Sequence, residues 1–440
     1  MNKADILIIG AGATGLMAAY KLTKAGRKVI LLEARDRCGG RIHTINEKSF
    51  SKNTELGAEF IHGDLPVTLR LLKKAGIAFN PASGEMVHYK NGKFDNDEGV
   101  EGWDLLMQKL KTIDKDISIN QFLDKEFAGD EFNELKQSVR QFAAGYDSAD
   151  PDKASTFALR NEWLNDDEEA QYRVNGGYGK LVDYLENEIK NASGSIIFNS
   201  IVTEVQWQPG HVAAITYIGT VYEAGQLLVA LPLGVLQACK DQLGAITFIP
   251  PISEQMAAIN QMGFGAIIKI LLEFDEPFWI DKQTQAQAGK SLENMSFLLS
   301  DEEIPTWWTQ APEPSTVITG WLGGPPAAAK KDVPDEEILK QSLQSLCNIF
   351  KRDMEELKSK LVASRIVNWT KDPFTRGAYA YDTVNASTFR EILKQPVDNT
   401  LFFAGEYLYE GAAMGTVEAA LTSGEEVAKK MLNTPVINIP

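Results

Sequence analysis

The chain opens with a short apolar run that leads directly into a glycine-rich turn. Ile6–Ile9 is apolar throughout, and the turn that follows carries Gly10, Gly12 and Gly15. An uninterrupted apolar run is typical of a parallel strand that is buried on both faces. The three glycines permit a tight turn, close approach of the backbone to a pyrophosphate and close packing of the next helix. The sequence therefore predicts a strand–turn–helix unit of the dinucleotide-binding kind.

The residues after the turn continue this pattern. A helix is expected from about Ala13 to Ala25, with Gly26 in the position of a C-terminal cap. Its free N–H groups and positive dipole would face phosphate groups. A second strand, Lys28–Leu32, leads to Glu33 about 20 residues beyond the glycines, where a carboxylate accepts both ribose hydroxyls. These elements predict the site for one half of a dinucleotide.

A second motif near the other end of the chain indicates which dinucleotide this is. Leu401–Gly405 is typical of one more buried parallel strand, and Glu406 follows it directly. Gly415 then precedes a final helix that is expected over Thr416–Leu432. This second motif can hold the other half of an extended cofactor. Together the two motifs indicate FAD rather than NAD, and therefore redox chemistry.

Composition and charge exclude several classes of protein. The net charge of −16 argues against a nucleic-acid partner, because binding to the phosphate backbone needs clustered Lys and Arg, and it favours cationic ligands. Cys38, Cys239 and Cys347 show neither disulfide nor metal-site spacing, which indicates a reducing compartment and no metal. No apolar run is long enough to span a bilayer. A soluble, cytoplasmic protein is expected, as a monomer or homodimer.

A chain of 440 residues exceeds what one hydrophobic core usually serves, so two domains are expected. Residues 84–184 are mostly helical in pattern, whereas alternating apolar runs at Ala266–Phe274 and Ser315–Leu322 predict an antiparallel sheet. The fold class is α/β, with a Rossmann-like FAD-binding domain built on a parallel sheet and interleaved with an α+β substrate domain. The expected FAD-binding domain comprises residues 1–83, 195–250 and 396–440, and the substrate domain residues 84–194 and 251–395.

A series of short motifs follows the glycine turn in a fixed order. They are Glu33-Ala34-Arg35, Gly39-Gly40-Arg41-x-x-Thr44, Leu56-Gly57-Ala58-x-Phe60, Ala230–Leu236, Lys269 followed by Pro277-Phe278-Trp279, Trp369 with Gly377-Ala378-Tyr379, and Ala404-Gly405-Glu406. In this order the chain resembles, essentially from end to end, the flavin-containing amine oxidases. That family includes monoamine oxidases, polyamine oxidases and the flavin-dependent histone lysine demethylases.

The resemblance implies a set of FAD contacts. Glu33 would bind the adenosine ribose, Val202 would contact adenine, and Arg35 and Arg41 would lie beside the pyrophosphate. Thr416 and Val417 would lie against the pyrimidine end of the flavin, where the positive end of the last helix would face charge that accumulates on reduction. The full set of expected cofactor-binding residues is Gly10, Gly12, Ala13, Gly15, Glu33, Ala34, Arg35, Gly40, Arg41, Gly57, Ala58, Glu59, Phe60, Val202, Trp369, Gly405, Glu406, Thr416 and Val417.

Lys269 is the first expected catalytic residue. It lies in the middle of an apolar strand, where an ammonium is costly unless it finds partners or loses its proton. A lysine on an edge strand that faces solvent is the structural alternative. The resemblance matches Lys269 with the family lysine that reaches flavin N5 through a bridging water, and it implies a role in the reaction of reduced flavin with oxygen.

The substrate side departs from the monoamine oxidases. Those enzymes place two tyrosines in front of the flavin, whereas here Tyr379 fills one position and Ala412 the other. His62 belongs to a triplet that animal polyamine oxidases also carry, and it is a further candidate catalytic residue that can hydrogen-bond a substrate amine; a structural histidine is the alternative. The relaxed tyrosine pair and this triplet favour a polyamine-like or long-chain amine. Ala378 replaces the cysteine that forms a thioether to the flavin in monoamine oxidases, so the FAD should be noncovalent.

The sequence predicts an FAD-dependent amine oxidase that takes a hydride from the amine α-carbon, releases an imine for hydrolysis and returns its electrons to oxygen as hydrogen peroxide. Three alternatives stay open. An L-amino acid oxidase usually carries an arginine soon after the Gly-Ala pair, where Glu59 and Phe60 stand here. A flavin desaturase or porphyrinogen oxidase would not require Lys269. A non-catalytic FAD-binding scaffold is the third.

Overall fold

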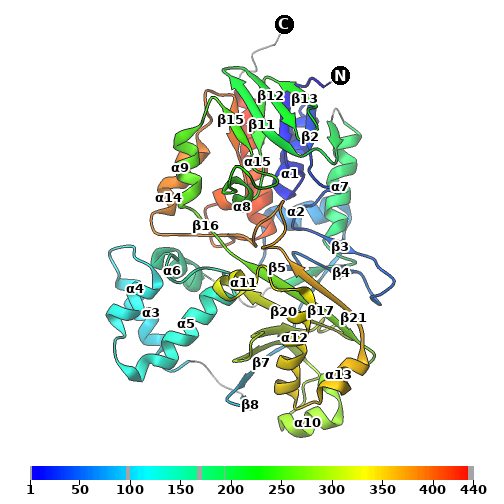
Figure 1. Cartoon of the computed structure of the whole chain (residues 1–440), viewed down its shortest axis with the longest axis vertical. Coiled ribbons are helices and arrows are strands. Elements are labelled where there is room, and N and C mark those ends of the chain that lie inside the picture. Colours follow the sequence, from blue (N-terminus) through cyan, green and yellow to red (C-terminus); the bar gives the residue numbers. More distant parts are fainter. Residues whose placement is uncertain (1, 96–99, 166–170, 193, 435–440) are drawn as a thin grey trace.

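The computed structural model describes residues 2–95, 100–165, 171–192 and 194–434. Figure 1 shows a parallel sheet with its helices in the upper part of the molecule. Below it lie a second large sheet on one side and a lobe of helices on the other. The chain passes between these parts several times, so that the α/β architecture is interleaved, as the sequence predicted.

The amino-terminal motif forms the centre of a five-stranded parallel sheet with the order β10-β2-β1-β14-β23. Every residue of β1 is buried, because helices cover one face of this sheet and further strands cover the other. The strands are β1 (Ile6–Ile9), β2 (Val29–Leu32), β10 (Gly194–Ile197), β14 (Gln226–Val229) and β23 (Leu401–Phe403). Residues from both ends of the chain are thereby brought into one sheet, with β14 between β1 and β23.

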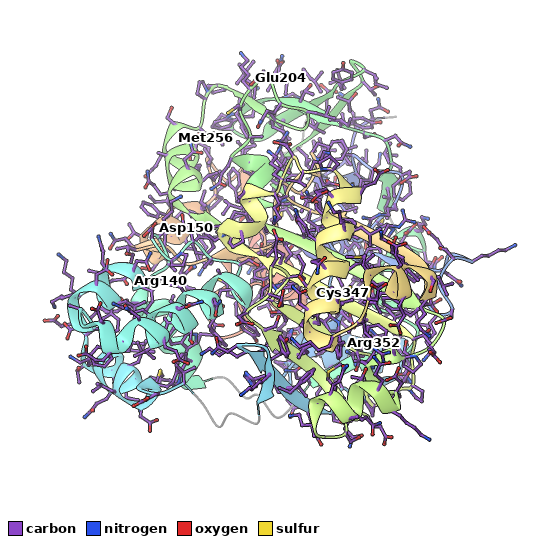
Figure 2. All side chains as sticks on the ribbon, turned by 60° about the horizontal axis from the view of Figure 1, so that its bottom comes forward. Arg140, Asp150, Glu204, Met256, Cys347 and Arg352 are labelled. Carbon is purple, nitrogen blue, oxygen red and sulfur yellow. The ribbon has the colours of Figure 1, made fainter. Side chains whose placement is uncertain are left out.

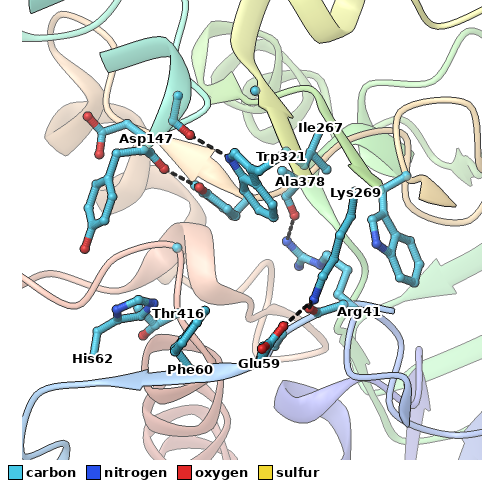
Figure 3. A pocket seen from close by; sticks show the side chains of 18 of the residues that line it. Arg41, Glu59, Phe60, His62, Asp147, Ile267, Lys269, Trp321, Ala378 and Thr416 are labelled. Atoms are coloured by element: carbon cyan, nitrogen blue, oxygen red, sulfur yellow. Dashed lines mark hydrogen bonds and ion pairs between the residues drawn. The ribbon is translucent and has the colours of Figure 1, made fainter. Parts of the chain in front are cut away.

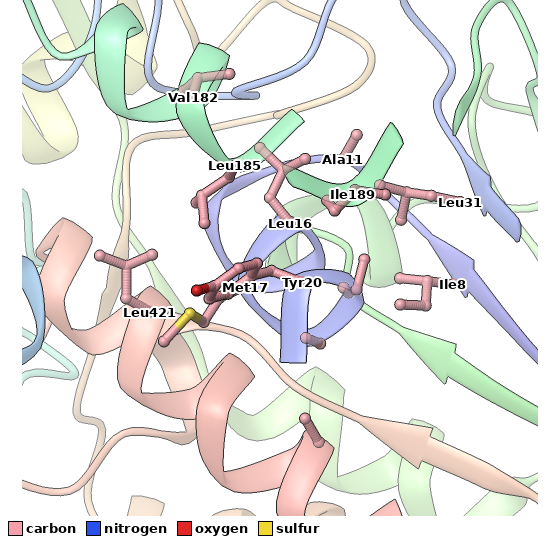
Figure 4. Packing of buried hydrophobic residues seen from close by; sticks show 14 of the residues in the cluster. Ile8, Ala11, Leu16, Met17, Tyr20, Leu31, Val182, Leu185, Ile189 and Leu421 are labelled. Carbon is pink, nitrogen blue, oxygen red and sulfur yellow. The ribbon is translucent and has the colours of Figure 1, made fainter. Parts of the chain in front are cut away.

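Three helices pack on one face of this sheet: α1 (Ala13–Lys24), α7 (Gly179–Lys190) and α15 (Val417–Asn433). Figure 4 shows Met17 and Tyr20 of α1 between Leu185 of α7 and Leu421 of α15. The opposite face is covered by a four-stranded sheet of order β13-β12-β11-β15. Its strands are β11 (Val202–Gln208), β12 (His211–Thr216), β13 (Val221–Ala224) and β15 (Thr247–Ile249).

The division of the chain into two domains remains a proposal, and the packing bears on its boundaries. The expected boundaries assign α7 to the substrate domain, yet α7 shares a core with α1. The expected boundaries also assign α9 (Ser253–Gln261) and α14 (Ala386–Lys394) to the substrate domain. These two helices contact each other and pack in a core with β23 of the parallel sheet. We would therefore extend the first domain to include these three helices.

The second large sheet has seven strands in the order β21-β17-β20-β19-β18-β7-β8. The predicted antiparallel pair is present as β17 and β20, whereas β7 lies within residues whose pattern is mostly helical. Among the described neighbouring strands of this sheet, only β7 and β18 pair in parallel. The strands are β7 (Glu85–Lys90), β8 (Lys93–Asp95), β17 (Ile267–Phe274), β18 (Met295–Ser300), β19 (Thr306–Trp308), β20 (Val317–Gly323) and β21 (Leu361–Asn368).

Helices cover one side of this sheet, and buried charges join them. Arg352 donates to Glu356 at 3.0 Å and is also paired with Asp281, which caps α10. Figure 2 shows Cys347 and Arg352 in this layer, and Arg140 on the separate helical lobe. The covering helices are α10 (Lys282–Ala288), α11 (Gly324–Ala329), α12 (Asp335–Phe350) and α13 (Met354–Lys360), with the 3-10 turn η2 (Phe278–Ile280).

The helical lobe has its own apolar core, which includes Leu106, Phe122 and Val139. Ser118 and Gln121 form a reciprocal capping box at the start of α4, which fixes where that helix begins. The lobe comprises α3 (Trp103–Thr112), α4 (Ile119–Glu126), η1 (Asp130–Phe132), α5 (Asn133–Gly145) and α6 (Thr156–Asn165). Predicted helical residues 132–144 thus appear as α5.

Short elements connect these parts. Two small sheets carry residues of the candidate site: β5 (Phe60–His62), β9 (Gln171–Val174) and β6 (Phe79–Pro81) form one, and β16 (Gly263–Phe264) and β22 (Ala380–Tyr381) the other. The remaining elements are β3 (Thr44–Ile45), β4 (Thr54–Glu55), α2 (Pro66–Ala75), α8 (Leu233–Leu236) and η3 (Glu406–Leu408). Among the helices that the structure describes, none is both long and apolar enough to cross a membrane.

Candidate active site

A cavity of about 1810 Å³ runs from the glycine turn after β1 to the seven-stranded sheet and the helical lobe. Its lining includes Gly12 at one end, Lys269 of β17, and Phe142 of α5. Pockets for a single small ligand are typically about 300 to 1,000 Å³. The cavity therefore has room for an extended cofactor together with a second molecule.

The expected cofactor residues, with one exception, line this cavity. Gly15 is the exception: a Cβ atom there would lie 2.0 Å from the carbonyl oxygen of Gly10, so Gly15 permits helix α1 to pack onto the turn. The lining residues among the expected set are Gly10, Gly12, Ala13, Glu33, Ala34, Arg35, Gly40, Arg41, Gly57, Ala58, Glu59, Phe60, Val202, Trp369, Gly405, Glu406, Thr416 and Val417.

The glycine turn leaves space at the start of α1. Gly10 has φ +101°, and a Cβ atom there would lie 2.5 Å from the carbonyl oxygen of Ala230. At Gly12, the N-cap of α1, a Cβ atom would meet nothing within 4 Å, and no side chain caps the helix. The first N–H groups of a helix need acceptors, and a phosphate supplies them. The geometry of this turn fits a pyrophosphate.

Glu33 lies at the end of β2 with a buried carboxylate. Its Oε2 accepts the N–H of Ala11 at 2.7 Å, and its Oε1 accepts the N–H of Arg35 at 2.9 Å. Burial raises the pKa of Glu33, although these two N–H groups act in the opposite direction. Each carboxylate oxygen keeps a further lone pair, so the group can still accept hydrogen bonds from a diol.

Two arginines of the motif differ in their partners. Arg41 donates from Nη1 to Glu406 Oε1 at 2.8 Å and to the carbonyl oxygen of Ala378 at 2.6 Å, as Figure 3 shows for the second bond. Arg35 instead forms a two-pronged pair with Asp372, with N–O distances of 2.6 and 3.0 Å. The charge of Arg35 is thus largely compensated within the protein.

Lys269 lies in the interior of the seven-stranded sheet, because β17 has β20 on one side and β21 on the other. The edge-strand alternative is therefore wrong. Its side chain is 1% exposed, and Nζ donates to Glu59 Oε2 at 2.9 Å and to the carbonyl oxygen of Gly57 at 3.1 Å. Figure 3 shows this pair in the cavity wall. Trp308 bounds the ammonium on another side, 5.3 Å from the ring centroid.

Glu59 is an ionised carboxylate in a buried place. Burial alone would raise its pKa, but the charges of Lys269 and Arg173 outweigh that effect and lower the pKa to about 2. Arg173 Nε and Gln310 Nε2 donate to its Oε1 at 3.1 and 3.0 Å. Glu59 lines the cavity, as expected, but its oxygens are directed at protein donors.

Tyr379 and His62 lie at the end of the cavity away from the glycine turn. The hydroxyl of Tyr379 donates to the carbonyl oxygen of Tyr146, and its ring packs on Gly415, where a Cβ atom would lie 2.8 Å from the ring. Burial raises the pKa of Tyr379. Burial lowers the pKa of His62 to about 4, and its Nδ1 has no hydrogen-bond partner among the described residues. His62 is thus neutral near pH 7.

Further aromatic residues complete this end of the cavity. Phe142 and Tyr146 from α5 and its C-terminus stack with ring centroids 5.4 Å apart. The ring centroid of Phe297 of β18 lies 5.5 Å from that of Phe60. Trp308 and Trp321 also line the cavity. The amphipathic pattern of α5 predicted a helix, but it carried no signal for which part of the molecule its aromatic residues would face.

Acidic side chains dominate the part of the lining beyond Lys269. Among the described residues of this part of the lining, the one Lys or Arg side chain is Lys90, which is paired with Glu134. The acidic residues are Asp64, Glu101, Asp104, Glu134, Asp147, Glu162, Asp301, Glu302 and Glu303. This charge distribution favours a cationic ligand over an anionic one.

Comparison with known proteins identifies related sequences and folds. The family model described as flavin containing amine oxidoreductase matches residues 13–432. Lysine-specific histone demethylase 2 of Homo sapiens is 28% identical over 98% of this chain and 53% of its own length, so the chain spans about half of that relative. Polyamine oxidase 2 of Arabidopsis thaliana is 28% identical, with 97% of this chain and 89% of the relative covered.

Two solved structures share the fold. One is a wild-type putrescine oxidase bound to putrescine, with a TM-score of 0.79, 20% identity, and coverage of 98% of this chain and 99% of the other. The other is cyclohexylamine oxidase from Brevibacterium oxydans, with a TM-score of 0.79, 18% identity and coverage of 97% and 98%. The resemblance inferred from the motifs is confirmed, and so is the fold class.

Proposed function

The chain belongs to the family of flavin-containing amine oxidoreductases, and from this premise we propose that it oxidises an extended, cationic amine with noncovalent FAD. One observation carries the proposal. A single cavity joins an uncapped helix and glycine turn at one end to the buried Lys269 and an acidic, aromatic wall at the other. The first end suits a dinucleotide, and the second suits an amine.

The residues of the nucleotide end fit FAD. The turn at Gly12 and the start of α1 would hold the pyrophosphate, and Glu33 the ribose of the adenosine. Helix α15 begins in the cavity wall at Val417 and would direct its positive end toward the flavin. When bound, FAD would supply the hydride acceptor and the route of the electrons to oxygen.

Noncovalent attachment is supported by the cysteine positions. Ala378 lines the cavity and carries no thiol, and none of Cys38, Cys239 and Cys347 is among the lining residues. A thioether to the cofactor therefore has no donor in the wall. All three thiols are free, which also supports the proposed cytoplasmic location, since that compartment is reducing.

The proposed net reaction for a primary amine is R–CH2–NH2 + O2 + H2O → R–CHO + NH3 + H2O2. The amine α-carbon loses a hydride, and the resulting imine is hydrolysed by water. The protein contributes binding and orientation. The acidic lining attracts the charged amine, Tyr379 and the aromatic residues enclose its carbon chain, and the neutral imidazole of His62 offers a hydrogen-bonding partner to its nitrogen.

Lys269 would act on the oxygen half of the cycle. Its ammonium is buried beside the segment Gly57–Phe60, which is expected to run alongside the flavin. A fixed positive charge in a dry site stabilises negative charge that develops as oxygen is reduced. This role differs from that of a general base, because a cation held by a carboxylate has no vacant lone pair for a substrate proton.

A polyamine-like or other long-chain amine is the proposed substrate class. The cavity extends from Lys269 past the aromatic wall to carboxylates on the helical lobe and the β18–β19 turn, so it can contact a second cationic group far from the reacting carbon. The structurally similar putrescine oxidase is a protein bound to a diamine. An L-amino acid substrate is disfavoured, because its carboxylate would meet Glu59 and the acidic lining.

A peroxide-coupled screen of the purified yellow protein tests this function. Primary amines, diamines, polyamines, acetylated polyamines and amino acids are compared at equal concentration. We expect peroxide with long amines, little with short monoamines and none with amino acids. Protein stripped of flavin and then reconstituted provides the control. Colourless protein that does not take up FAD, or peroxide release with amino acids alone, would contradict the proposal.

A further inference from the structure

Glu59 and Lys269 form a buried ion pair whose two members come from different parts of the fold. Lys269 is in β17, and Glu59 immediately precedes β5. Their side chains are 1% and 6% exposed, and Nζ lies 2.9 Å from Oε2. The contact is direct, so the lysine is anchored by a protein carboxylate rather than standing alone in an apolar strand.

Glu59 is itself held rigidly by its second oxygen. Oε1 accepts from Arg173 Nε and Gln310 Nε2, which lie on β9 and just after β19. Arg173 is fixed in turn, because its Nη atoms donate to the carbonyl oxygens of Thr309 at 2.8 Å and Ala311 at 2.9 Å. With Oε1 fully engaged, the carboxylate cannot rotate away, and Oε2 stays directed at Lys269.

The ammonium of Lys269 has three donors, and two of them are used within the protein. Glu59 accepts one, and the carbonyl oxygen of Gly57 accepts another. Gly57 is held close by the fold, since a Cβ atom there would lie 1.8 Å from the carbonyl oxygen of Arg41. The donor that remains belongs to a side chain that lines the cavity.

We infer that Glu59 is a positioning residue for Lys269: it balances the ammonium and fixes the direction of its remaining donor, so that the pair sets the electrostatic potential beside the flavin. The inference rests on the proposed function, since it takes the redox end of FAD to lie where Lys269 meets the cavity. It gives Glu59 a role other than the cofactor contact expected from the sequence.

Because Glu59 and Lys269 carry opposite charges, substitutions can change the net charge of the pair one unit at a time. The wild-type pair sums to zero, Glu59→Gln leaves +1, Lys269→Met leaves −1, and the double variant again sums to zero. Reduction adds negative charge to a flavin, so a more positive surrounding raises its reduction potential. An ion pair far from the flavin would not order the four potentials in this way.

The first measurement is therefore the reduction potential of the bound flavin in these four proteins, without any amine. We expect a potential above wild type for Glu59→Gln, below wild type for Lys269→Met, and close to wild type for the double variant. Glu273→Gln is the matched control. Glu273 is a buried carboxylate on the same strand, bonded to Ser51 N–H and the hydroxyl of Thr316, and it does not line the cavity. The flavin in Glu273→Gln should have the same reduction potential as in wild type.

The second measurement separates the half-reactions by stopped flow. Glu59→Gln should slow the reaction of reduced protein with oxygen about tenfold, because the ammonium is no longer held in one direction, and this loss outweighs the gain in positive charge. Reduction by the amine should change less than about threefold. In the Lys269→Met background the same substitution should change the oxygen rate less than about twofold, because the residue through which Glu59 acts is gone.

Three outcomes overturn the inference: a Glu59→Gln potential at or below wild type, a shift of the same size in Glu273→Gln, or an equal effect of Glu59→Gln on the oxygen rate with and without Lys269. If Glu59→Gln does not fold, a crystal structure of flavin-loaded wild type decides, since Nζ must remain within hydrogen-bond distance of Glu59 and Gly57. Failure of the proposed function is a different result: wild-type protein would bind no FAD, or no amine would reduce its bound flavin.

Discussion

The guanidinium of Arg41 donates a hydrogen bond of 2.8 Å to the carboxylate of Glu406, across 365 positions of the sequence. Glu406 follows β23, and its side chain is 3% exposed. Arg41 also holds the carbonyl oxygen of Ala378, so one side chain ties three distant segments together in the cavity wall. The cofactor cavity therefore depends on contacts that form only in the complete fold.

Removal of this link should weaken FAD binding. In Arg41→Met the buried carboxylate of Glu406 loses its cation, and a charged hydrogen bond of this kind contributes about 1.5 to 3 kcal/mol. We expect the Kd for FAD to rise about tenfold to hundredfold, measured by titration of the apoprotein. Arg365→Met is the control, because Arg365 pairs with Glu47 on the surface and lies outside the cavity. An unchanged Kd in Arg41→Met would show that the link does not shape the site.

Two glycines of the turn should respond differently to alanine. In Gly15→Ala the new methyl group would lie 2.0 Å from a backbone oxygen, so the apoprotein should lose several degrees in Tm. In Gly12→Ala the methyl group has open space, so apoprotein stability should hold while FAD affinity falls. Differential scanning calorimetry and flavin titration measure the two effects. Equal behaviour of the two variants would contradict the division of roles between packing and cofactor approach.

Lys269→Met should still bind FAD but should react slowly with oxygen. The substitution removes the buried ammonium and keeps a side chain of similar length. We expect reoxidation to slow by about one to two orders of magnitude, with a smaller effect on amine-dependent reduction, as followed by flavin absorbance. Lys282→Met, an exposed lysine at the start of α10, should match wild type. Normal oxygen kinetics in Lys269→Met would remove Lys269 from this step.

Turnover at low substrate should rise with pH, because the reacting amine must be neutral for its α-carbon to lose a hydride, while a second amine group far from it can stay charged. A free alkylamine has a pKa of about 10.4, so its neutral fraction grows about tenfold per pH unit below that value. Burial lowers the pKa of His62 to about 4, and the pKa of Glu59 is about 2, so neither group titrates between about pH 7 and pH 9. We expect kcat/KM to climb across this range, and an amine of lower pKa to reach its plateau at lower pH. A flat or falling profile would argue against binding of the neutral amine.

Glu55 should make stability depend on pH in the neutral range. Burial raises its pKa from 4.5 to about 7, against the hydrogen bonds from Tyr178 N–H and the hydroxyl of Thr44. A raised folded pKa gives stability that is present below about pH 4.5 and is lost as pH rises to about 7. Glu55→Gln mimics the protonated carboxyl, so urea unfolding should show it more stable than wild type by about 1 to 3 kcal/mol at pH 8, and similar at pH 5. Equal stability of Glu55→Gln and wild type at pH 8 would show that ionisation of Glu55 does not destabilise the fold.

Local sequence was sufficient for the nucleotide half of the fold. The glycine turn, the strand that ends at Glu33 and the helix that begins near Thr416 were predicted close to their observed bounds, because each is specified by its own residues. The same reasoning predicted β17 and singled out Lys269 within it.

The partners of those residues could not be predicted, since they depend on pairing between distant segments. Nothing near Glu59 in the sequence indicates Lys269, and nothing in α5 indicates that Tyr146 would accept the hydroxyl of Tyr379. Strand β7 was missed for the same reason: its Val87 and Tyr89 face inward only because β18 lies beside it. Motif order recovered the family, whereas the wall of the substrate cavity required the tertiary structure.

The order of strands in the parallel sheet has a consequence for synthesis. Helix α1 precedes α15 by about 400 residues in the chain, yet it completes its packing only against α15. Until α15 has been synthesised, the apolar face of α1 lacks that cover. The nucleotide-binding half of the fold therefore cannot be completed by the residues around the glycine turn alone.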